Sequence, residues 1–577
     1  MKQYFKYIKP HIIFFIFGPL FMITEVVGEV LMPKLISVII DSGVSKGDIS
    51  SVTTTGIMMI LVALMMMLGG VLGNYFAVRA SVGFATGLRS DLFKKVQKFS
   101  FKNIDDFSTG SLVTRLTNDI TQMQNVIRMS LVMLLRAPGM LIGALIMAIS
   151  INPRLAMVIA VVIPILATAI ITIMVKAFPR FNIMQKKLDK VNSDIQENLT
   201  NVRVVKSFVR SDYENEKFSK SNRDLRDSTL KAMNLVIKNG PVMTLMMNIT
   251  TLAVVWTGGN FIIKGSMEVG ELTAFTTYIV QILMSLMMVS MIILSASRAM
   301  ASSKRIKEVL NTESDITDDN AKEKDKKIEN GTVEFKNVCF SYNSSSSVKI
   351  LDNINFKVES GKTLGVIGAT GSGKTSLVQL IPRLYDVTEG EILIDGTDVR
   401  DYSLHNLREG VAMVLQKNTL FSGTIEENLR WGKEDATDEE IQRFTSYAQA
   451  HSFITSFTDG YETELGQGGV NVSGGQKQRL CIARALIKGP KILILDDSTS
   501  AVDTATETRI RESFSNDLRD TTKIIIAQRI TSVMEADKII VIDDGKIVGE
   551  GTHQELLMGN PHYQEIYYSQ KDKEANA

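Results

Sequence analysis

Gly368-Ala369-Thr370-Gly371-Ser372-Gly373-Lys374-Thr375 fits the phosphate-loop pattern G-x-x-x-x-G-K-[ST]. In this pattern glycines let backbone N–H groups close around phosphates, the lysine meets the terminal phosphates and the hydroxyl holds Mg²⁺. The flanks support a real site over a fortuitous glycine turn, because 363–367 predict a short apolar strand and 376–380 predict the start of a helix. All eight residues are therefore predicted to bind a nucleotide, and Thr375 to bind Mg²⁺.

The whole chain is too long for one soluble core. Its 577 residues predict at least two units, since domains commonly run to about 100–200 residues. Hydrophobic residues make up 45% of the sequence and the net charge is only +2, so nothing in the composition points to nucleic acid. Cys339 and Cys481 lie far apart without metal-ligand spacing, which predicts no disulfide framework and suits a reducing cytosol.

The first half contains six apolar runs long enough to cross a bilayer. A run of about 18 residues with few charges suffices to span the hydrocarbon core. The runs lie at roughly 12–36, 54–77, 130–150, 155–175, 241–263 and 273–297. None resembles a cleaved signal peptide, because the first run is too long and lacks a small-residue cleavage site. We therefore expect a six-span α-helical membrane domain over 1–310.

The distribution of Lys and Arg predicts how these spans are oriented. Basic residues gather before the first span and in two long polar insertions, 78–128 and 176–239, while the short connections hold only Lys46, Arg154 and Lys264. Because cytoplasmic loops carry the excess of Lys and Arg, both termini and both insertions are predicted to be cytoplasmic. This arrangement fits a multi-pass protein of the plasma membrane.

The two insertions keep a helical apolar period, so they are predicted to continue the membrane helices into the cytoplasm. Each has one break where a short connecting helix could sit, near 103–109 and near 211–216. We expect an element held out there to touch whatever the C-terminal half forms.

Charged and methionine side chains within the spans are candidate cargo contacts. Glu25 and Glu29 share one helix face at i and i+4, and Arg136 lies in the third span. Ionisable groups at such depth are costly and tend to face a cavity, although internal pairing is the alternative. Met243 and Met287 belong to a Met-rich set that either faces lipid and packs the helices or forms an adaptable wall for varied apolar ligands.

The second half follows a linker. Residues 311–328 are dense in both charges and lack an apolar period, which is typical of a solvated connection. From 329 to 570 short β-type runs alternate with helical ones, which predicts an α/β nucleotide-binding domain with a parallel sheet, followed by a tail at 571–577.

Two further motifs accompany the phosphate loop. The apolar strand 492–495 delivers Asp496 to its end, where a carboxylate could complete the Mg²⁺ site opposite Thr375. A glycine turn that opens a helix, Ser473-Gly474-Gly475-Gln476, makes a second anion-binding end. Because one domain needs only one such end for its own nucleotide, the turn is predicted to cap a nucleotide held by another chain.

This combination of motifs resembles an ABC exporter half-transporter of the kind found in bacterial multidrug pumps. The resemblance covers nearly the whole chain. It implies ATP and Mg²⁺ as cofactors and makes the two breaks the coupling helices. It also implies that Tyr342 stacks on adenine, that Gln416 reaches Mg²⁺ and senses the membrane half, and that Asp503 is the acid of the loop after the Mg²⁺ strand.

The chain departs from this family at two positions that perform chemistry. Where the family usually has Glu to orient or deprotonate the attacking water, this chain has Asp497. The shorter side chain withdraws the carboxylate by roughly 1 Å, a displacement that can cost about 10²-fold in rate. Where the family has a histidine that contacts the γ-phosphate, this chain has Gln528, which can donate a hydrogen bond but cannot carry a cation.

The departures predict an asymmetric pair of subunits. This chain's own site should bind MgATP and hydrolyse it poorly, while its intact 473–476 turn completes the site of a partner half-transporter that supplies Glu and His. The alternatives are a homodimer that hydrolyses slowly with Asp497 and, more remotely, a nucleotide-gated regulator or channel that pumps nothing. The predicted cargo is an amphipathic drug-like or lipid-like compound.

Overall fold

The computed structural model describes residues 2–342 and 348–575, and this part of the chain forms two compact units. One unit combines the residues up to Gln97 with Thr109–Asn311. The other combines Lys98–Ser108 with the residues from Thr312 onward. A short piece from the first half of the sequence therefore belongs to the second unit.

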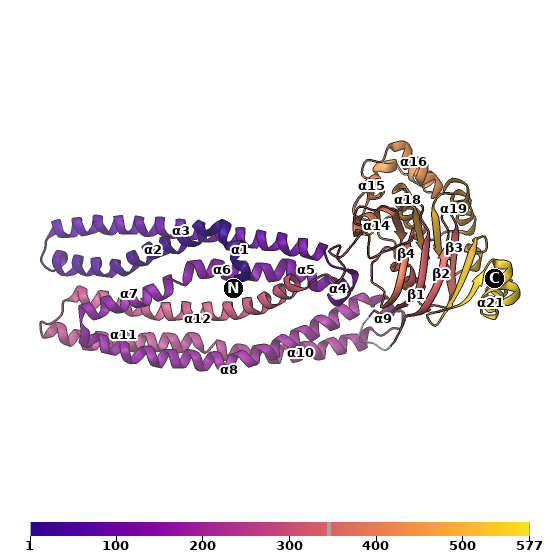
Figure 1. Cartoon of the computed structure of the whole chain (residues 1–577). Helices are drawn as coiled ribbons and strands as arrows, with labels where there is room; N and C mark the ends of the chain where they lie inside the picture. Colours follow the sequence, from indigo (N-terminus) through magenta and orange to yellow (C-terminus); the bar gives the residue numbers. More distant parts are fainter. Residues whose placement is uncertain (1, 343–347, 576–577) are drawn as a thin grey trace. The chain divides into compact units, whose positions relative to one another are not determined.

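The first unit is built from long helices (Figure 1). Among the described residues, six helical stretches are long and apolar enough to cross a membrane, which confirms the six predicted spans. The helices of this unit are α1 (Phe5–Ile8), α2 (Ile12–Val38), α3 (Ile49–Gln97), α5 (Thr109–Thr114), α6 (Ile120–Met133), α7 (Arg136–Ile151), α8 (Pro153–Thr200), α9 (Val202–Ser207), α10 (Ser211–Val236), α11 (Asn239–Ile263) and α12 (Val269–Asn311).

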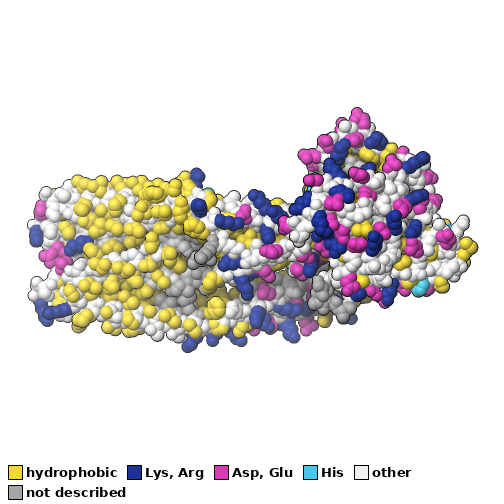
Figure 2. All heavy atoms as spheres, in the orientation of Figure 1, with side chains coloured by type: hydrophobic (Ala, Val, Ile, Leu, Met, Phe, Trp, Pro, Cys, Tyr) yellow, Lys and Arg dark blue, Asp and Glu magenta, His cyan; other side chains and the backbone are white. Residues whose placement is uncertain are grey.

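Apolar side chains cover much of the surface of this helical unit on the face shown in Figure 2. Such a surface suits contact with lipid rather than water. Inside the unit, a hydroxyl ties two distant helices together: Tyr278 Oη of α12 donates to the carbonyl of Val30 in α2 at 2.8 Å. Helix α12 thus packs against the first span.

The predicted break near 211–216 lies a few residues too late, because 208–210 leave the helical conformation and Ser211–Glu216 already form the first turns of α10. A second interruption lies earlier, at Asn201 (φ −107°, ψ 20°), and the short helix between the two interruptions is α9. The apolar period runs unbroken across 191–208 in the sequence, so it conceals a backbone break at a polar residue within it.

The second unit is an α/β structure, as predicted. Its helices are α4 (Phe101–Asp106), α13 (Lys374–Gln379), α14 (Leu404–Gly410), α15 (Ile425–Arg430), α16 (Asp438–Tyr447), α17 (His451–Ser456), α18 (Gly474–Ile487), α19 (Thr504–Asp517), α20 (His553–Gly559) and α21 (Pro561–Ala575). Its strands are β1 (Val333–Phe340), β2 (Leu351–Val358), β3 (Thr363–Gly368), β4 (Glu389–Ile394), β5 (Thr397–Asp398), β6 (Val411–Val414), β7 (Gly423–Thr424), β8 (Glu464–Leu465), β9 (Ile492–Asp496), β10 (Thr522–Ile526), β11 (Lys538–Asp543) and β12 (Lys546–Gly551).

The largest sheet positions the nucleotide motifs. Its order is β12-β11-β3-β10-β9-β6, and all neighbours are parallel except β11 and β12. Because ligands of such sheets bind at the carboxyl ends of the strands, the residues that follow β3, β9 and β10 meet at one edge. These are the phosphate loop, Asp497 and Gln528.

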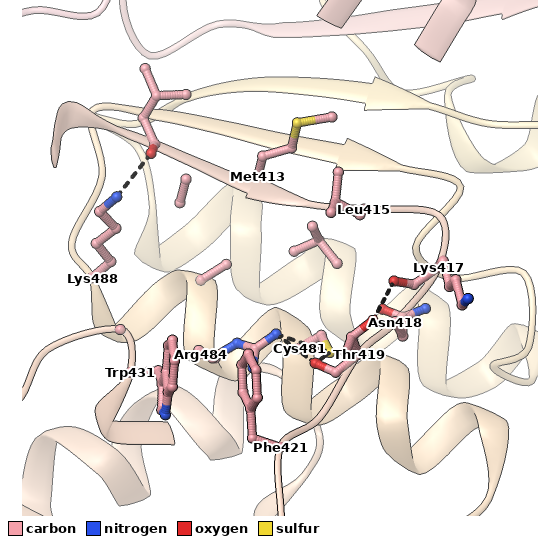
Figure 3. A pocket seen from close by; sticks show the side chains of 15 residues that line it. Met413, Leu415, Lys417, Asn418, Thr419, Phe421, Trp431, Cys481, Arg484 and Lys488 are labelled. Carbon is pink, nitrogen blue, oxygen red and sulfur yellow. Dashed lines mark hydrogen bonds between the residues drawn. The ribbon is translucent and has the colours of Figure 1, made fainter. Parts of the chain in front are cut away.

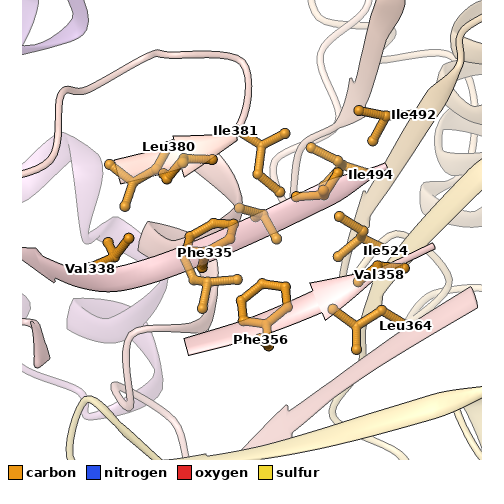
Figure 4. Packing of buried hydrophobic residues seen from close by; sticks show 14 of the residues in the cluster. Phe335, Val338, Phe356, Val358, Leu364, Leu380, Ile381, Ile492, Ile494 and Ile524 are labelled. Carbon is orange, nitrogen blue, oxygen red and sulfur yellow. The ribbon is translucent and has the colours of Figure 1, made fainter. Parts of the chain in front are cut away.

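A core of apolar side chains joins this sheet to the β2-β1-β4-β5 sheet (Figure 4). Phe335 and Phe356 stack with ring centroids 4.4 Å apart. Ile492, Ile494 and Ile524 of the parallel sheet belong to the same cluster and are fully or almost fully buried. The core therefore holds in place the strands that carry the nucleotide motifs.

Helix α4 belongs to this second unit, so the expected contact of the first break with the C-terminal half is confirmed. A capping box between Ser100 and Asn103 starts the helix. Tyr385 Oη donates to Asp105 at 2.7 Å, and the Tyr385 ring packs on Phe101.

The stretches at the start and at the end of the second unit are also structured. Within the stretch that the sequence marks as a linker, Ile316 and Ile328 are buried, and Asp318 accepts from the Leu404 amide. At the other end, α21 continues to Ala575, through most of the stretch that the sequence marks as a tail.

Candidate functional site

The phosphate loop connects β3 to α13. Gly371 and Gly373 have φ values of 87° and 99°, a left-handed conformation that glycine adopts without steric cost. A side chain at Gly373 would also meet the carbonyl of Ile350 at 3.0 Å. These glycines let the backbone turn tightly around a phosphate group.

Lys374 is held within the loop. Its Nζ donates to the carbonyls of Gly368 at 2.9 Å and Ala369 at 2.7 Å. Burial lowers the pKa of Lys374, and the nearby carboxylates of Asp496 and Asp497 oppose this shift. The ammonium therefore stands beside the place where terminal phosphates would lie.

Thr375 and Asp496 meet as the sequence predicts. Thr375 Oγ1 donates to Asp496 Oδ1 at 3.1 Å, while Oδ2 of Asp496 is buried and has no hydrogen-bond partner among the described residues. A hydroxyl and a carboxylate with a spare oxygen are ligands that Mg²⁺ prefers, so these side chains fit the ion. A bound Mg²⁺ would neutralise charge on the phosphate oxygens.

Tyr342 lies over the start of α13. Its hydroxyl is 2.8 Å from Ser376 Oγ, and its ring packs edge-on against Tyr385 with centroids 5.1 Å apart. The side chain is half-exposed, so one surface of the ring is accessible to a base. Its expected stacking on adenine stays a prediction.

Asp497 and Gln528, the two unusual residues, contact one another. Gln528 Nε2 donates to Asp497 Oδ2 at 2.8 Å. Asp497 adopts a left-handed backbone (φ 50°), and its amide donates to the Ile526 carbonyl at 3.0 Å. Burial raises the pKa of Asp497, while hydrogen bonds from Gln416 and Gln528 favour the charged form.

Gln416 thus joins the group around Asp497, and the segment that follows it borders a cavity of about 280 Å³ (Figure 3). Phe421 and Trp431 stack on one side, with centroids 4.2 Å apart. Arg484 Nη2 donates to the Thr419 carbonyl at 3.0 Å. None of the phosphate-loop residues lines this cavity.

The 473–476 turn opens α18 as predicted. Ser473 and Gln476 form a capping box, with Ser473 N donating to Gln476 Oε1 at 2.8 Å. At Gly475 an added Cβ would lie 2.7 Å from the Ala501 carbonyl, so glycine allows the loop before α19 to approach. Gln478, which the sequence analysis missed, holds that loop by accepting from the Ala501 amide at 2.9 Å.

Asp503 caps the next helix. Its carboxylate accepts from the Thr506 amide at 3.0 Å and thereby satisfies an N-terminal N–H of α19. This backbone hydrogen bond lowers the pKa of Asp503.

The three charged residues predicted to lie within the spans form one cluster. Arg136 Nη2 lies 3.1 Å from Glu25 Oε1 and 2.6 Å from Glu29 Oε1. Gln281 of α12 donates to the Glu29 carbonyl at 2.8 Å. Two carboxylates face one guanidinium, and within the described residues the second oxygen of each carboxylate has no hydrogen-bond partner.

The two methionines predicted to contact cargo lie among apolar side chains. Met243 is buried within a cluster that joins α2, α7, α8, α11 and α12, and Met287 is partly buried against the same cluster. These positions serve packing in the described state.

Together the apolar helices, the phosphate loop and the Thr375–Asp496 pair define a membrane-spanning P-loop ATPase. The chain belongs to the ABC transporter family: residues 15–286 match the ABC transporter transmembrane region and residues 351–500 match the ABC transporter model. Its fold is that of an ABC exporter, and membership of the ABC transporter family implies a transport ATPase.

Relatives match along nearly the whole length. The uncharacterized ABC transporter ATP-binding protein YfiB of Bacillus subtilis is 40% identical over 579 residues, covering 100% of both chains. The ATP-dependent lipid A-core flippase of Desulfotalea psychrophila is 34% identical over 515 residues, covering 89% of each. The solved structure of a bacterial Atm1-family ABC exporter with ATP bound shares the fold, with a TM-score of 0.81, 24% identity and 98% of each chain covered.

Proposed function

We propose that this chain is one half of a heterodimeric exporter, with an ATP site of its own that binds MgATP firmly and hydrolyses it slowly. The partner half-transporter would supply a catalytic Glu and a switch His, and the 473–476 turn of this chain would close over the partner's ATP. Both chain termini would lie in the cytoplasm.

The Asp497–Gln528 hydrogen bond is the observation that carries this proposal. A general base needs a carboxylate lone pair that faces the attacking water. Oδ2 of Asp497 already accepts from Gln528, which fixes the orientation of the carboxylate, and the side chain of Asp497 is one methylene shorter than that of Glu. The amide cannot take up or relay a proton at neutral pH, so the pair suits retention of ATP better than its cleavage.

The parts that hold nucleotide support the same proposal. Lys374, Thr375 and Asp496 are assembled, and the capping box at Ser473 presents a well-formed helix N-terminus. In the proposed cycle, closure over two ATP molecules pulls on α4 and turns the membrane cavity outward, and hydrolysis in the partner's site reopens it.

The test compares ATPase activity of this chain in lipid, alone and co-expressed with the half-transporter encoded beside it. We expect little turnover alone and robust turnover in the pair. In the pair, Ser473→Ala should abolish most activity, whereas Asp497→Asn should change it little. The double variant Asp497→Glu plus Gln528→His should raise hydrolysis by this chain's site about 10²-fold.

Robust turnover by this chain alone would instead support a homodimer in which Asp497 is a competent catalytic residue. ATP-dependent conformational change without transport by the pair would support a nucleotide-gated regulator.

We further propose that the cargo is a small amphipathic compound with a cationic head group. Glu25 and Glu29 outnumber Arg136, so the fully ionised cluster carries one uncompensated negative charge, and a cation would use the two unpaired carboxylate oxygens. Related proteins are named for multidrug export and for lipid A-core flipping, which supports amphipathic cargo.

Export of a cationic dye from vesicles tests this assignment. Glu29→Gln should raise the KM for a cationic dye several-fold and leave a neutral dye of similar size unaffected, because the variant removes charge without removing volume. Equal effects on both dyes would contradict a charge-selective contact.

A further inference from the structure

The C-terminal helix is bonded to the loop that carries Gln528. Gln570 of α21 donates from Nε2 to the Gln528 carbonyl at 2.7 Å and accepts at Oε1 from the Ile530 amide at 2.9 Å. One side chain therefore spans the peptide groups on both sides of Arg529. The loop leaves the sheet at β10 and has no strand partner at these positions, so Gln570 supplies two of its backbone hydrogen bonds.

Helix α21 is a firm support for this contact. Asn560 caps it by accepting from the Tyr563 amide at 2.9 Å and donating to the Val548 carbonyl at 2.8 Å. Tyr563 is fully buried in a cluster that also contains Ala527 and Ile530, the residues that flank the loop. The loop and the helix share one apolar core.

The contacts continue from Gln570 to the nucleotide site. Gln570 fixes the backbone of Gln528, and the Gln528 side chain donates one N–H to Asp497. A side-chain amide has two N–H donors. Among the described residues the second N–H of Gln528 has no hydrogen-bond partner, so it is free to meet a terminal phosphate.

We propose that Gln570 is a positioning residue that holds the Gln528 loop of this chain's ATP site and thereby slows the release of MgATP. This inference rests on the proposed role of the site as one that retains ATP. Because each neutral hydrogen bond contributes modestly to the stability of the loop, removing both contacts should speed the release of MgATP by roughly tenfold.

Helix α21 contains a matched control. Gln564 is the same residue type on the same helix, but its Nε2 donates to the Leu557 carbonyl in α20 and not to the Gln528 loop. Gln564→Leu therefore removes a hydrogen bond of the helix without touching the nucleotide site. The conservative variant Gln570→Glu keeps an acceptor for the Ile530 amide and loses the donor to the Gln528 carbonyl.

The experiment uses the full chain co-expressed with its partner subunit in lipid. The probe is radiolabelled 8-azido-ATP with Mg²⁺, chased with excess ATP and cross-linked at intervals. Separation of the subunits on a gel then reports occupancy of this chain's site. We expect Gln570→Leu to speed release roughly tenfold, Gln570→Glu to give a smaller effect, and Gln564→Leu to match the wild type.

A double variant distinguishes loss of the position of the Gln528 loop from general destabilisation of the nucleotide-binding unit. Because Gln570 acts through Gln528, Gln570→Leu should add nothing to release in a Gln528→Ala background. Equal release from the Gln570 and Gln564 variants, or full acceleration in the Gln528→Ala background, would overturn the inference. The proposed function fails separately, through robust ATPase activity of the chain alone, and in that case the same chase still measures the effect of Gln570.

Discussion

At the scale of single residues, Arg136 and its two carboxylates form a largely buried ion-pair cluster in the helical unit. Removing one partner of a buried ion pair leaves an uncompensated charge and costs about 3–5 kcal/mol, whereas replacing all partners by neutral residues can be nearly neutral. Arg136→Met should therefore lower the unfolding midpoint more than the triple variant Glu25→Gln, Glu29→Gln and Arg136→Met. Thermal unfolding in detergent measures both, and a triple variant less stable than Arg136→Met would contradict the ion-pair interpretation.

The sequence predicted the residues of the nucleotide site where a local pattern defines them. Lys374 and Thr375 follow from one loop, and Asp496 follows from the end of an apolar strand. Gln570 and Gln281 could not be found in this way. Their partners lie 42 and 252 residues away, and an isolated glutamine on a helix carries no pattern that indicates a distant backbone contact.

Single elements depend on their caps, and Asp503 at the start of α19 gives a clear case. Asp503→Ala should lower the thermal midpoint of the nucleotide unit by roughly 2–4 °C, because it removes the acceptor of the Thr506 amide, whereas Asp503→Asn should change it little since Asn is an equally good cap. Differential scanning calorimetry of the full chain measures these shifts.

The same cap predicts a pH dependence. The hydrogen bond from the Thr506 backbone lowers the folded-state pKa of Asp503, so the charged cap stabilises the fold above the ordinary Asp pKa of about 3.9 and loses this effect as the pH falls through the lower folded value. Asp503→Asn should lack this contribution to acid sensitivity. Identical acid unfolding of both proteins would contradict it.

Helix α4 depends on the nucleotide unit for its position. Tyr385→Phe keeps the ring contact with Phe101 and removes the hydrogen bond to Asp105. We expect the amides of α4 to exchange roughly tenfold faster with deuterated solvent, since a hydrogen bond to a charged group contributes about 1.5–3 kcal/mol. Unchanged exchange would show that the ring contact alone holds the helix.

The apolar periodicity of the sequence predicted where helices and strands lie better than it predicted where a helix is interrupted. The six spans and the parallel sheet follow from apolar runs, and the structure contains them. The start of α9 does not follow, because Asn201 interrupts the backbone while the apolar side chains around it keep a helical spacing. Tertiary packing decides whether a helix is interrupted at a polar residue, and a single sequence does not show that packing.

For the whole molecule, the predicted membrane orientation can be read from cysteine labelling. Both natural cysteines, Cys339 and Cys481, are buried, so background labelling should be low. Lys46→Cys and Lys264→Cys should react with a membrane-impermeant maleimide in intact cells, and Lys186→Cys only after lysis, because basic insertions stay in the cytoplasm. Labelling of Lys186→Cys in intact cells would reverse the orientation.

The assignment of α4 to the second unit has a consequence for how the protein is made. Tyr385 follows Asp105 by 280 residues. At a synthesis rate of about 5–20 residues per second, the ribosome needs roughly 15–60 seconds to deliver the residue that holds α4. During that interval most of the membrane helices emerge and insert while the tip between α3 and α5 stays unsupported. The nucleotide unit then completes itself by capturing a segment that was synthesised long before it.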